Sequence, residues 1–285
     1  MSQQESTTKR LVKGTSVTWI RLAITIVAQV VTTPVYLHYW SAETYGTWLL
    51  IMAAIGFLQI PGASFQNYIG FELMRESTQD KSKFSTLLIS SIRFGALYGL
   101  VELSVAWLLS FAVIPGIVGT DATDLLRSQA SQAFFFMALG SGLVWNWGGM
   151  WVRGANATGY YARGAWWGVA DGLVRVLSPL IVLSLGYGMT GAALGLAVSL
   201  MVLHQFTLRN LKKFVRLDMT PDASVDWRLV WVAFRHSQML SLKSGLEMLR
   251  QQGIRLVLGP LTGATQLAAF ASMRTFANAA LQGLN

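Results

Sequence analysis

The sequence predicts an all-α fold, a polytopic membrane helix bundle, and three observations support this class. Only 12% of the 285 residues are charged and 53% are hydrophobic, whereas soluble proteins carry about 25% charged residues. The apolar residues form successive runs of about 20, the length that a helix needs to cross about 30 Å of hydrocarbon. The basic residues gather in the short segments between these runs. One soluble core could not bury this much apolar surface, so we expect the chain to lie in a bilayer.

Eight runs qualify as membrane-spanning helices, of which the eighth is incomplete. The first is too long in its apolar part for a cleaved signal peptide, and no small-residue cleavage site follows it. Pro34 and Pro61 are expected either to kink the first two helices or to serve helix packing. The expected spans are residues 17–38, 46–71, 86–113, 130–151, 166–186, 189–208, 238–258 and 266–285.

The basic residues of the loops are distributed unequally between the two sides of the membrane. The loops on the side of the N-terminus contain fourteen basic residues, whereas the loops on the opposite side contain Arg127 alone. The positive-inside rule therefore places the N-terminus in the cytoplasm. This asymmetry accounts for the net charge of +9 without a nucleic-acid partner. The basic residues of the cytoplasmic loops are Lys9, Arg10, Lys13, Arg75, Lys81, Lys83, Arg153, Arg163, Arg209, Lys212, Lys213, Arg216, Arg228 and Arg235.

The composition argues against several kinds of chemistry. The chain contains no cysteine, so disulfides, thiolate nucleophiles and cysteine-based metal sites are excluded. Its three histidines, His38, His204 and His236, lie far apart in the sequence. We therefore expect no bound metal and no cofactor.

A polar, basic segment at residues 209–226 predicts a boundary between two lobes. The expected domains are residues 1–221, an N-terminal lobe of about six helices, and residues 222–285, the start of a second lobe. A weak internal repeat at a shift of 221 positions agrees with this division, as in transporters built from parallel repeats. Residues 227–237 have the apolar spacing of an interfacial helix, although they could equally form the first turns of the seventh span.

Charged residues inside the expected spans point to a cationic interior. At about 2.5–3.5 kcal/mol for each central charge, seven basic residues facing lipid would cost on the order of 20 kcal/mol, so most must face protein or water. The same spans contain only three acids, Glu102, Asp171 and Glu247. The seven basic residues are Arg21, Arg93, Arg175, Lys243, Arg250, Arg255 and Arg274.

Helical spacing indicates which of these groups share a face. Arg21 and Gln29 belong to a polar stripe on the first span, which lines a cavity, forms a helix seam or lets Arg21 reach the surface. Asp171 can pair with Arg175 four residues later, as a structural ion pair or as part of a site.

Lys243 and Arg250 flank Glu247 on the seventh span, which leaves this triplet with net positive charge. Arg93 and Glu102 face opposite ways and should not pair. Glu102 then needs another partner, as a structural or as a proton-coupling acid. The predicted substrate-binding residues are Arg21, Gln29, Arg175, Lys243 and Arg250, and the predicted coupling or ion-pair residues are Glu102, Asp171 and Glu247.

A cationic cleft between helices favours an anionic ligand such as pyrophosphate, because arginine forks match phosphate oxygens. Residues 11–48, with Lys13-Gly14 and the Glu43, Tyr45 and Gly46 turn, resemble the opening of the polysaccharide and O-antigen flippases of the MATE-like superfamily. Residues 253–270 resemble the passage that opens the second lobe of that family.

The resemblance implies a MATE-like two-lobe architecture, here with a complete N-lobe and the first two helices of the second lobe. It also implies a bacterial inner-membrane transporter of undecaprenyl-pyrophosphate-linked oligosaccharide that works by alternating access. Its expected partners are this substrate, membrane lipids, and a polysaccharide polymerase with other assembly proteins. Two alternatives stay open: a MATE-type cation-coupled multidrug antiporter and an inactive truncated flippase. A glycosyltransferase, polymerase or ligase acting on the same lipid is not expected, because the largest external loop, at about residues 114–129, offers only Asp121, Asp124 and Arg127. We therefore expect no catalytic residue and no enzymatic activity.

Overall fold

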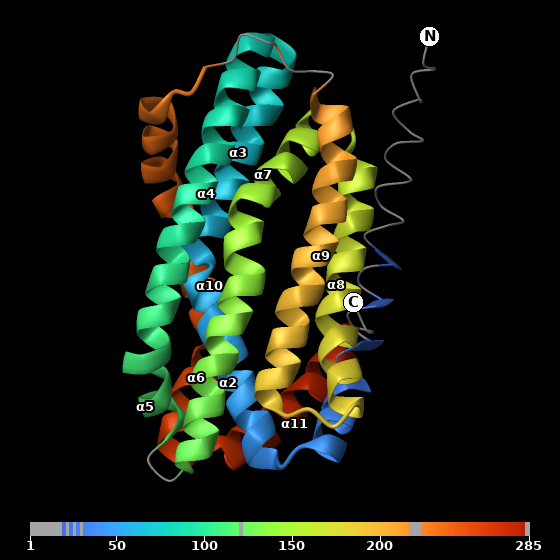
Figure 1. Ribbon diagram of the computed structural model, residues 1–285, viewed down its shortest axis with the longest axis vertical. Helices are drawn as coiled ribbons and strands as arrows, with labels where there is room; N and C mark the ends of the chain where they lie inside the picture. The colour runs from blue at the N-terminus through green and yellow to red at the C-terminus, as the bar shows by residue number, and fades with distance from the viewer. Residues whose placement is uncertain are drawn as a thin grey trace.

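The computed structural model describes residues 19–20, 23–24, 27–28, 31–119, 122–216, 220 and 224–282, and it leaves the side chains of residues 143, 259 and 275–282 undescribed. Every regular element in these ranges is a helix, which confirms the predicted all-α class. The long helices run side by side along one axis (Figure 1). Successive connections lie at alternate ends of the bundle, as a chain that crosses a membrane repeatedly requires (Figure 1).

The helices follow the predicted order of spans. Residues 31–39 are helical and belong to the first expected span. The second span is the pair α2–α3, the fourth combines α6, a π-helical segment η1 and α7, and the short α5 lies between the third and fourth. The bounds are α2 (Ala42–Leu58), α3 (Ile60–Gln79), α4 (Lys81–Ala112), α5 (Ile114–Val118), α6 (Asp124–Ala138), η1 (Leu139–Leu143), α7 (Val144–Ala157), α8 (Tyr161–Ser184), α9 (Met189–Val215), α10 (Trp227–Thr262) and α11 (Ala264–Gln282).

Three of these helices, α4, α8 and α9, are long and apolar enough to cross a membrane. The pair α2–α3 qualifies together, with a bend of 45° between its helices. Pro61 lies in the first turn of α3, directly after this bend, so a bend at Pro61 is the observed form of the two expected for the second span. Membrane crossing by α6–α7, α10 and α11 stays a prediction.

Polar residues in the connections determine where several helices begin. Ser41 accepts a hydrogen bond from the backbone N–H of Thr44 at the start of α2, and Asp80 accepts from the N–H groups of Ser82 and Lys83 at the start of α4. These side chains satisfy donors that the first turn of a helix leaves free. Asp226 caps α10 in the same way and donates its own N–H to the Ser90 hydroxyl of α4. The segment before α10 is therefore anchored to the first part of the chain.

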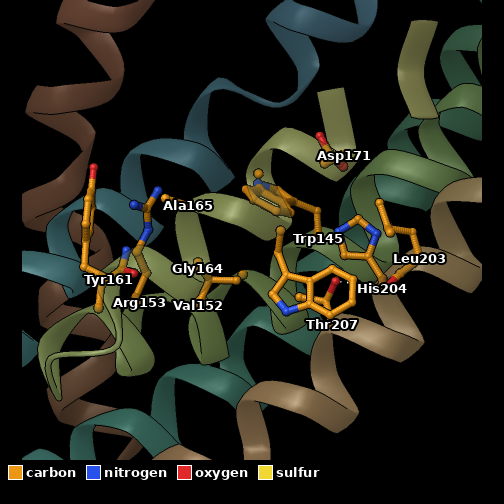
Figure 2. Close-up of a pocket in the computed structure, with 14 residues that line it drawn as sticks. Trp145, Val152, Arg153, Tyr161, Gly164, Ala165, Asp171, Leu203, His204 and Thr207 are labelled. Carbon is orange, nitrogen blue, oxygen red and sulfur yellow. Dashed lines mark hydrogen bonds between the residues drawn. The ribbon is translucent and has the colours of Figure 1, made fainter. Parts of the chain in front are cut away.

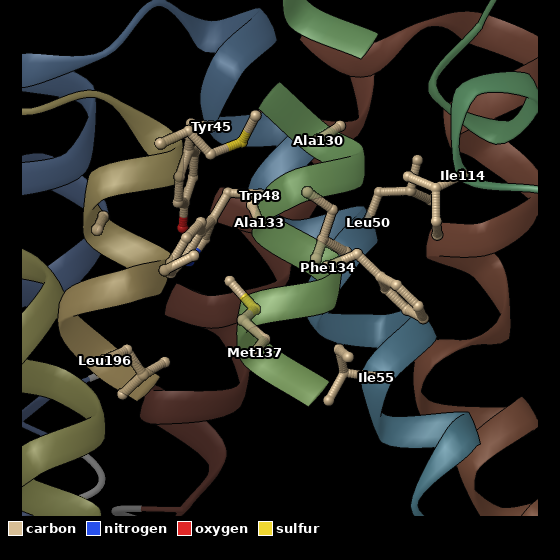
Figure 3. Packing of buried hydrophobic residues seen from close by; sticks show 14 of the residues in the cluster. Tyr45, Trp48, Leu50, Ile55, Ile114, Ala130, Ala133, Phe134, Met137 and Leu196 are labelled. Carbon is tan, nitrogen blue, oxygen red and sulfur yellow. The ribbon is translucent and has the colours of Figure 1, made fainter. Parts of the chain in front are cut away.

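Among the described residues, the buried apolar side chains form two separate clusters. The first joins α2, α6 and α9 through Tyr45, Trp48, Phe134, Met137 and Leu196, which interdigitate between these helices (Figure 3). The second lies at the other end of the bundle and joins α3, the start of α4, α7 and the end of α9. The bend between α2 and α3 thus coincides with the boundary between the two clusters. A layer of polar side chains separates the two clusters. It consists of Gln59, Glu102, Ser141 and Asn146.

The seventh span begins as one long helix, which is one of the two forms predicted for residues 227–237. Residues 227–237 are not a separate interfacial helix, because α10 continues without a break from Trp227 to Thr262. The apolar residues of its first turns, Val230 and Ala233, pack in the second cluster, which explains the amphipathic spacing. The alternative, the first turns of one long helix, is the observed form.

Candidate functional site

A cavity with a volume of about 400 Å³ lies between α7, α8 and α9 and is the candidate site. Arg153 and Tyr161 lie at one end of it, and Trp145, His204 and Thr207 lie at the other (Figure 2). The remaining residues that line it are Gly149, Val152, Asn156, Gly164, Ala165, Trp167, Gly168, Asp171 and Leu203.

Helical periodicity explains why these residues face one space. On α7, residues 145, 149, 152 and 156 recur every three or four positions, and residues 161, 164, 168 and 171 do the same on α8. Such positions share one side of a helix. Gly149 lies against Gln66 of α3 and Gly164 lies against Asn156 of α7, and a Cβ atom at either glycine would overlap that side chain. These close contacts bring α7 next to α3 and α8 beside the cavity.

Most polar groups of the cavity are held by neighbours. Asp171 accepts a hydrogen bond from Nε of Arg175 at 2.7 Å, and Arg153 donates from Nη2 to Oδ1 of Asn67 at 2.7 Å. The Nδ1 atom of His204 lies 2.8 Å from the carbonyl oxygen of Leu200. Oδ1 of Asn156 is buried without a hydrogen-bond partner among the described residues, so it remains a free acceptor.

This combination of side chains suits two kinds of ligand. Indole rings present apolar faces, while carboxylate, amide, guanidinium and hydroxyl groups provide directional hydrogen bonds. A sugar ring needs both, since its faces are apolar and its edges carry hydroxyls. An organic cation is also compatible, because an aromatic face and the Asp171 carboxylate attract positive charge.

Of the predicted site residues, Asp171 lines the cavity and Arg175 is bonded to it. The predicted Asp171–Arg175 pairing is therefore confirmed, and it neutralises Arg175. Arg21 and Gln29, which were predicted to line a cleft, lie outside the described residues. Lys243, Glu247 and Arg250 lie on α10 and do not line this cavity.

The charges on α10 form the predicted triplet, in which Lys243 and Arg250 both interact electrostatically with Glu247. Glu247 binds Nη2 of Arg250 at 2.5 Å and also accepts a hydrogen bond from Gln251. Lys243 is exposed and forms no ion pair among the described residues. The positive charge that remains on this face is thus carried by Lys243 rather than by Arg250.

Two further cations, Arg255 on α10 and Arg274 on α11, were not among the predicted site residues. Arg255 on α10 has a buried Nε atom without a hydrogen-bond partner within the described part of the chain. It lies close enough to Tyr45 of α2 and Arg274 of α11 for electrostatic interaction with both. Neither arginine forms an ion pair with a described carboxylate. The one available signal was their presence among the seven basic residues inside the spans.

Glu102 finds its partner far away in the sequence. Its Oε2 atom accepts a hydrogen bond of 2.7 Å from Nδ2 of Asn146 on α7, and no ion pair with Arg93 occurs among the described residues. The predictions that Arg93 and Glu102 do not pair, and that Glu102 has another partner, are both confirmed. The side chain is only 4% exposed, which makes it the most deeply buried of the three acids in the spans.

The fold is that of the MATE transporters. The chain is similar to the MATE multidrug transporter DinF-BH in a ligand complex, with a TM-score of 0.67 and 12% identity, covering 95% of this chain and 61% of that one. It is also similar to an outward-facing multidrug resistance MATE family transporter of the MOP superfamily, with a TM-score of 0.66 and 14% identity, covering 94% of this chain and 64% of that one. No protein-family model matches the sequence, and no curated protein matches it.

The chain thus spans less than two thirds of the length of each of these two transporters. At this level of identity the similarity establishes an all-α membrane bundle of MATE type. Substrate and mechanism have to be argued from this chain's own residues.

Proposed function

We propose that the chain belongs to a bacterial inner-membrane transporter that moves undecaprenyl-pyrophosphate-linked oligosaccharide by alternating access. The observation that carries this proposal is the excess of positive charge on α10 and α11. Lys243, Arg255 and Arg274 form no ion pair with a carboxylate among the described residues, in helices expected to lie in the bilayer. Fixed cations in a low dielectric favour an anionic ligand, and guanidinium groups match pyrophosphate oxygens in geometry.

The cavity between α7, α8 and α9 supplies the second part of the proposal. Its volume of about 400 Å³ suits a small saccharide, and Trp145 and Trp167 provide ring faces beside the hydrogen-bonding groups. In this scheme the cations hold the diphosphate, the cavity takes sugar rings, and the prenyl chain stays in lipid. With the N-terminus cytoplasmic, the substrate enters from the cytoplasmic leaflet and is passed to a polymerase and other assembly proteins.

A MATE-type cation-coupled multidrug antiporter is the second candidate, and two observations favour it. The two similar structures are MATE multidrug transporters. Asp171 and the two tryptophans of the cavity are also suitable for an organic cation. The three unpaired cations on α10 and α11 argue against it, because they repel such a ligand.

Ligand binding to the purified full chain in lipid nanodiscs separates these candidates. The probes are a short-chain polyprenyl-pyrophosphate disaccharide, its monophosphate analogue, and the cationic dye rhodamine 6G. We expect the pyrophosphate lipid to bind more tightly than the monophosphate. Arg255→Gln should weaken it about tenfold, the effect of one lost charge-assisted hydrogen bond.

Arg93→Gln is the matched control, since Arg93 is an exposed cation on α4 without an ion pair among the described residues. Equal binding by the Arg255 and Arg93 variants would contradict the proposal. Tighter binding of the cationic dye than of either lipid would support the antiporter instead.

A further inference from the structure

The polar layer between the two hydrophobic clusters contains an acid whose hydrogen bonding is incomplete. Glu102 is 4% exposed, and its Oε1 atom is buried without a hydrogen-bond partner among the described residues. Oε2 has a single donor, Nδ2 of Asn146 at 2.7 Å. The other hydrogen of this amide is used by the carbonyl oxygen of Gly142 at 2.9 Å, so Asn146 has no further donor to offer.

The elements around Glu102 provide no compensating charge. The other side chains of the polar layer are Gln59 between α2 and α3, Ser141 of η1 and Asn146 of α7, all of them neutral. On α4 itself, Tyr98 is the titratable group that interacts electrostatically with Glu102. Among the described residues, α5, α6 and α10 place no charged side chain in an ion pair with it, and its environment consists of Asn146 and apolar surroundings. An ionised carboxylate here would be a buried charge with one hydrogen bond.

The same contacts connect Glu102 to the bend between α2 and α3. Gly62 lies in the first turn of α3, and a Cβ atom at this position would overlap Oδ1 of Asn146. The amide that binds Glu102 is therefore packed directly against the helix that begins at the bend. Gln59, the residue between α2 and α3, donates from Nε2 to the hydroxyl of Ser141 in η1. Asn146 therefore connects the Glu102 carboxylate to the start of α3. The Gln59–Ser141 hydrogen bond connects the residue at the bend to the π-helix η1. π-Helical segments of this kind often occur at functional sites.

We propose that Glu102 is a proton-binding site whose occupancy sets the angle between α2 and α3. In the described conformation Oε1 carries the proton, because a buried hydroxyl without a partner costs less than a buried charge with one donor. Loss of this proton to water leaves a carboxylate that requires further donors. Asn146 can supply a second donor only by turning its other N–H away from the Gly142 carbonyl oxygen. This rotation shifts the amide that packs on Gly62 and so moves the start of α3. This site is independent of the transported substrate, so it can stand or fall separately from the proposed function.

Infrared spectroscopy of the full chain in nanodiscs tests the proton directly. The difference spectrum is taken between alkaline buffer and buffer at about pH 6, where exposed carboxyls with pKa values of about 4 are ionised. It should contain the C=O stretch of a protonated carboxylic acid, with a small downshift in D₂O. Glu102→Gln should remove this band. Asp171→Asn is the matched control and should retain it, because Asp171 is paired with Arg175 in the structure. A wild-type spectrum without the band, or a band that survives Glu102→Gln, would overturn the proposal.

A distance measurement tests the link to the bend. The native chain has no cysteine, so spin labels can be placed at Met52→Cys on α2 and Phe71→Cys on α3, both exposed positions. Electron–electron resonance should show two inter-label distances whose proportions change with pH, and Glu102→Gln should fix the acidic proportion. Glu76→Gln, at an ion pair whose arginine, Arg75, is exposed, should respond to pH as the unmodified chain does.

Two results would refute this second step. One is an inter-label distance that does not depend on pH in the unmodified chain, and the other is an unchanged pH response after Glu102→Gln. A distance that follows sodium concentration at constant pH would assign the site to sodium and would also contradict a proton site. Unfolding of the Glu102 variant would leave the unmodified chain's response as the deciding measurement.

Discussion

Substitution of Gly46 tests the contact between α2 and α11, which joins the first part of the bundle to its last helix. A Cβ atom at Gly46 would overlap the backbone carbonyl oxygen of Ala264, the first residue of α11. Backbone atoms cannot rotate away as a side chain can, so Gly46→Ala must displace α11. Overpacking of this kind costs about 1–3 kcal/mol. The alanine recovers about 0.5–1 kcal/mol of helix propensity, so a net loss of about 1–2 kcal/mol is expected.

Gly172 on α8 is the matched control. It is also a helical glycine, but a Cβ atom there meets no atom within 4 Å. Gly172→Ala should therefore be neutral or should stabilise the chain by up to about 1 kcal/mol. The two variants are expected to differ by about 1–3 kcal/mol in free energy of unfolding, measured by reversible SDS titration in mixed micelles. Equal values would refute the close approach of α2 and α11.

Three further predictions concern the ion pair, the core and a helix cap. Asp171→Asn leaves Arg175 without a carboxylate and should cost about 1–2 kcal/mol of unfolding free energy, because the pair is partly exposed. Adding Arg175→Gln should restore most of this loss in a double-mutant cycle. Purely additive losses would exclude coupling between the two residues. Phe65→Ala removes a 1%-exposed ring that packs on Phe94 and Phe234. It should lower the free energy of unfolding by about 2–4 kcal/mol because of the cavity it leaves. An equal effect from Phe71→Ala, at an exposed ring, would show that these ring contacts do not contribute. Asp80→Ala removes the cap of α4 and should lower the free energy of unfolding by about 1 kcal/mol. Asp80→Asn keeps a capping oxygen and should lose little. A loss of the same size in both variants would assign the effect to the charge of Asp80.

The helices could be predicted from the sequence because each expected span is one long apolar run. The bend of the second span was predictable for a local reason, since Pro61 lacks the backbone donor and disfavours helical geometry before it. The local pairs Asp171–Arg175 and Glu247–Arg250 are likewise found in the structure, because positions three or four apart share a helix face. The long-helix form of α10 was left undecided, because an interfacial helix and a buried first turn have the same apolar spacing.

The site could be predicted only in part, because its decisive contacts are not local. Glu102 and Asn146 are 44 positions apart, and no periodicity in either helix relates them. The cavity depends on the way in which α7, α8 and α9 pack, so Trp145 and His204 carried no signal in the sequence. Arg255 was counted among the interior cations, but its position beside Tyr45 and Arg274 follows from the packing of α2, α10 and α11.

Translocation in sealed proteoliposomes tests the central claim most directly. The full chain is reconstituted with a fluorescent polyprenyl-pyrophosphate oligosaccharide, and the fraction of label that a membrane-impermeant quencher can reach is followed over time. We predict that this fraction rises above the half expected for the outer leaflet, and that Lys243→Gln combined with Arg255→Gln slows the rise while Arg93→Gln does not. A fraction that stays at the level of protein-free vesicles, or equal rates in the three proteins, would contradict transport of an anionic lipid-linked glycan by these cations.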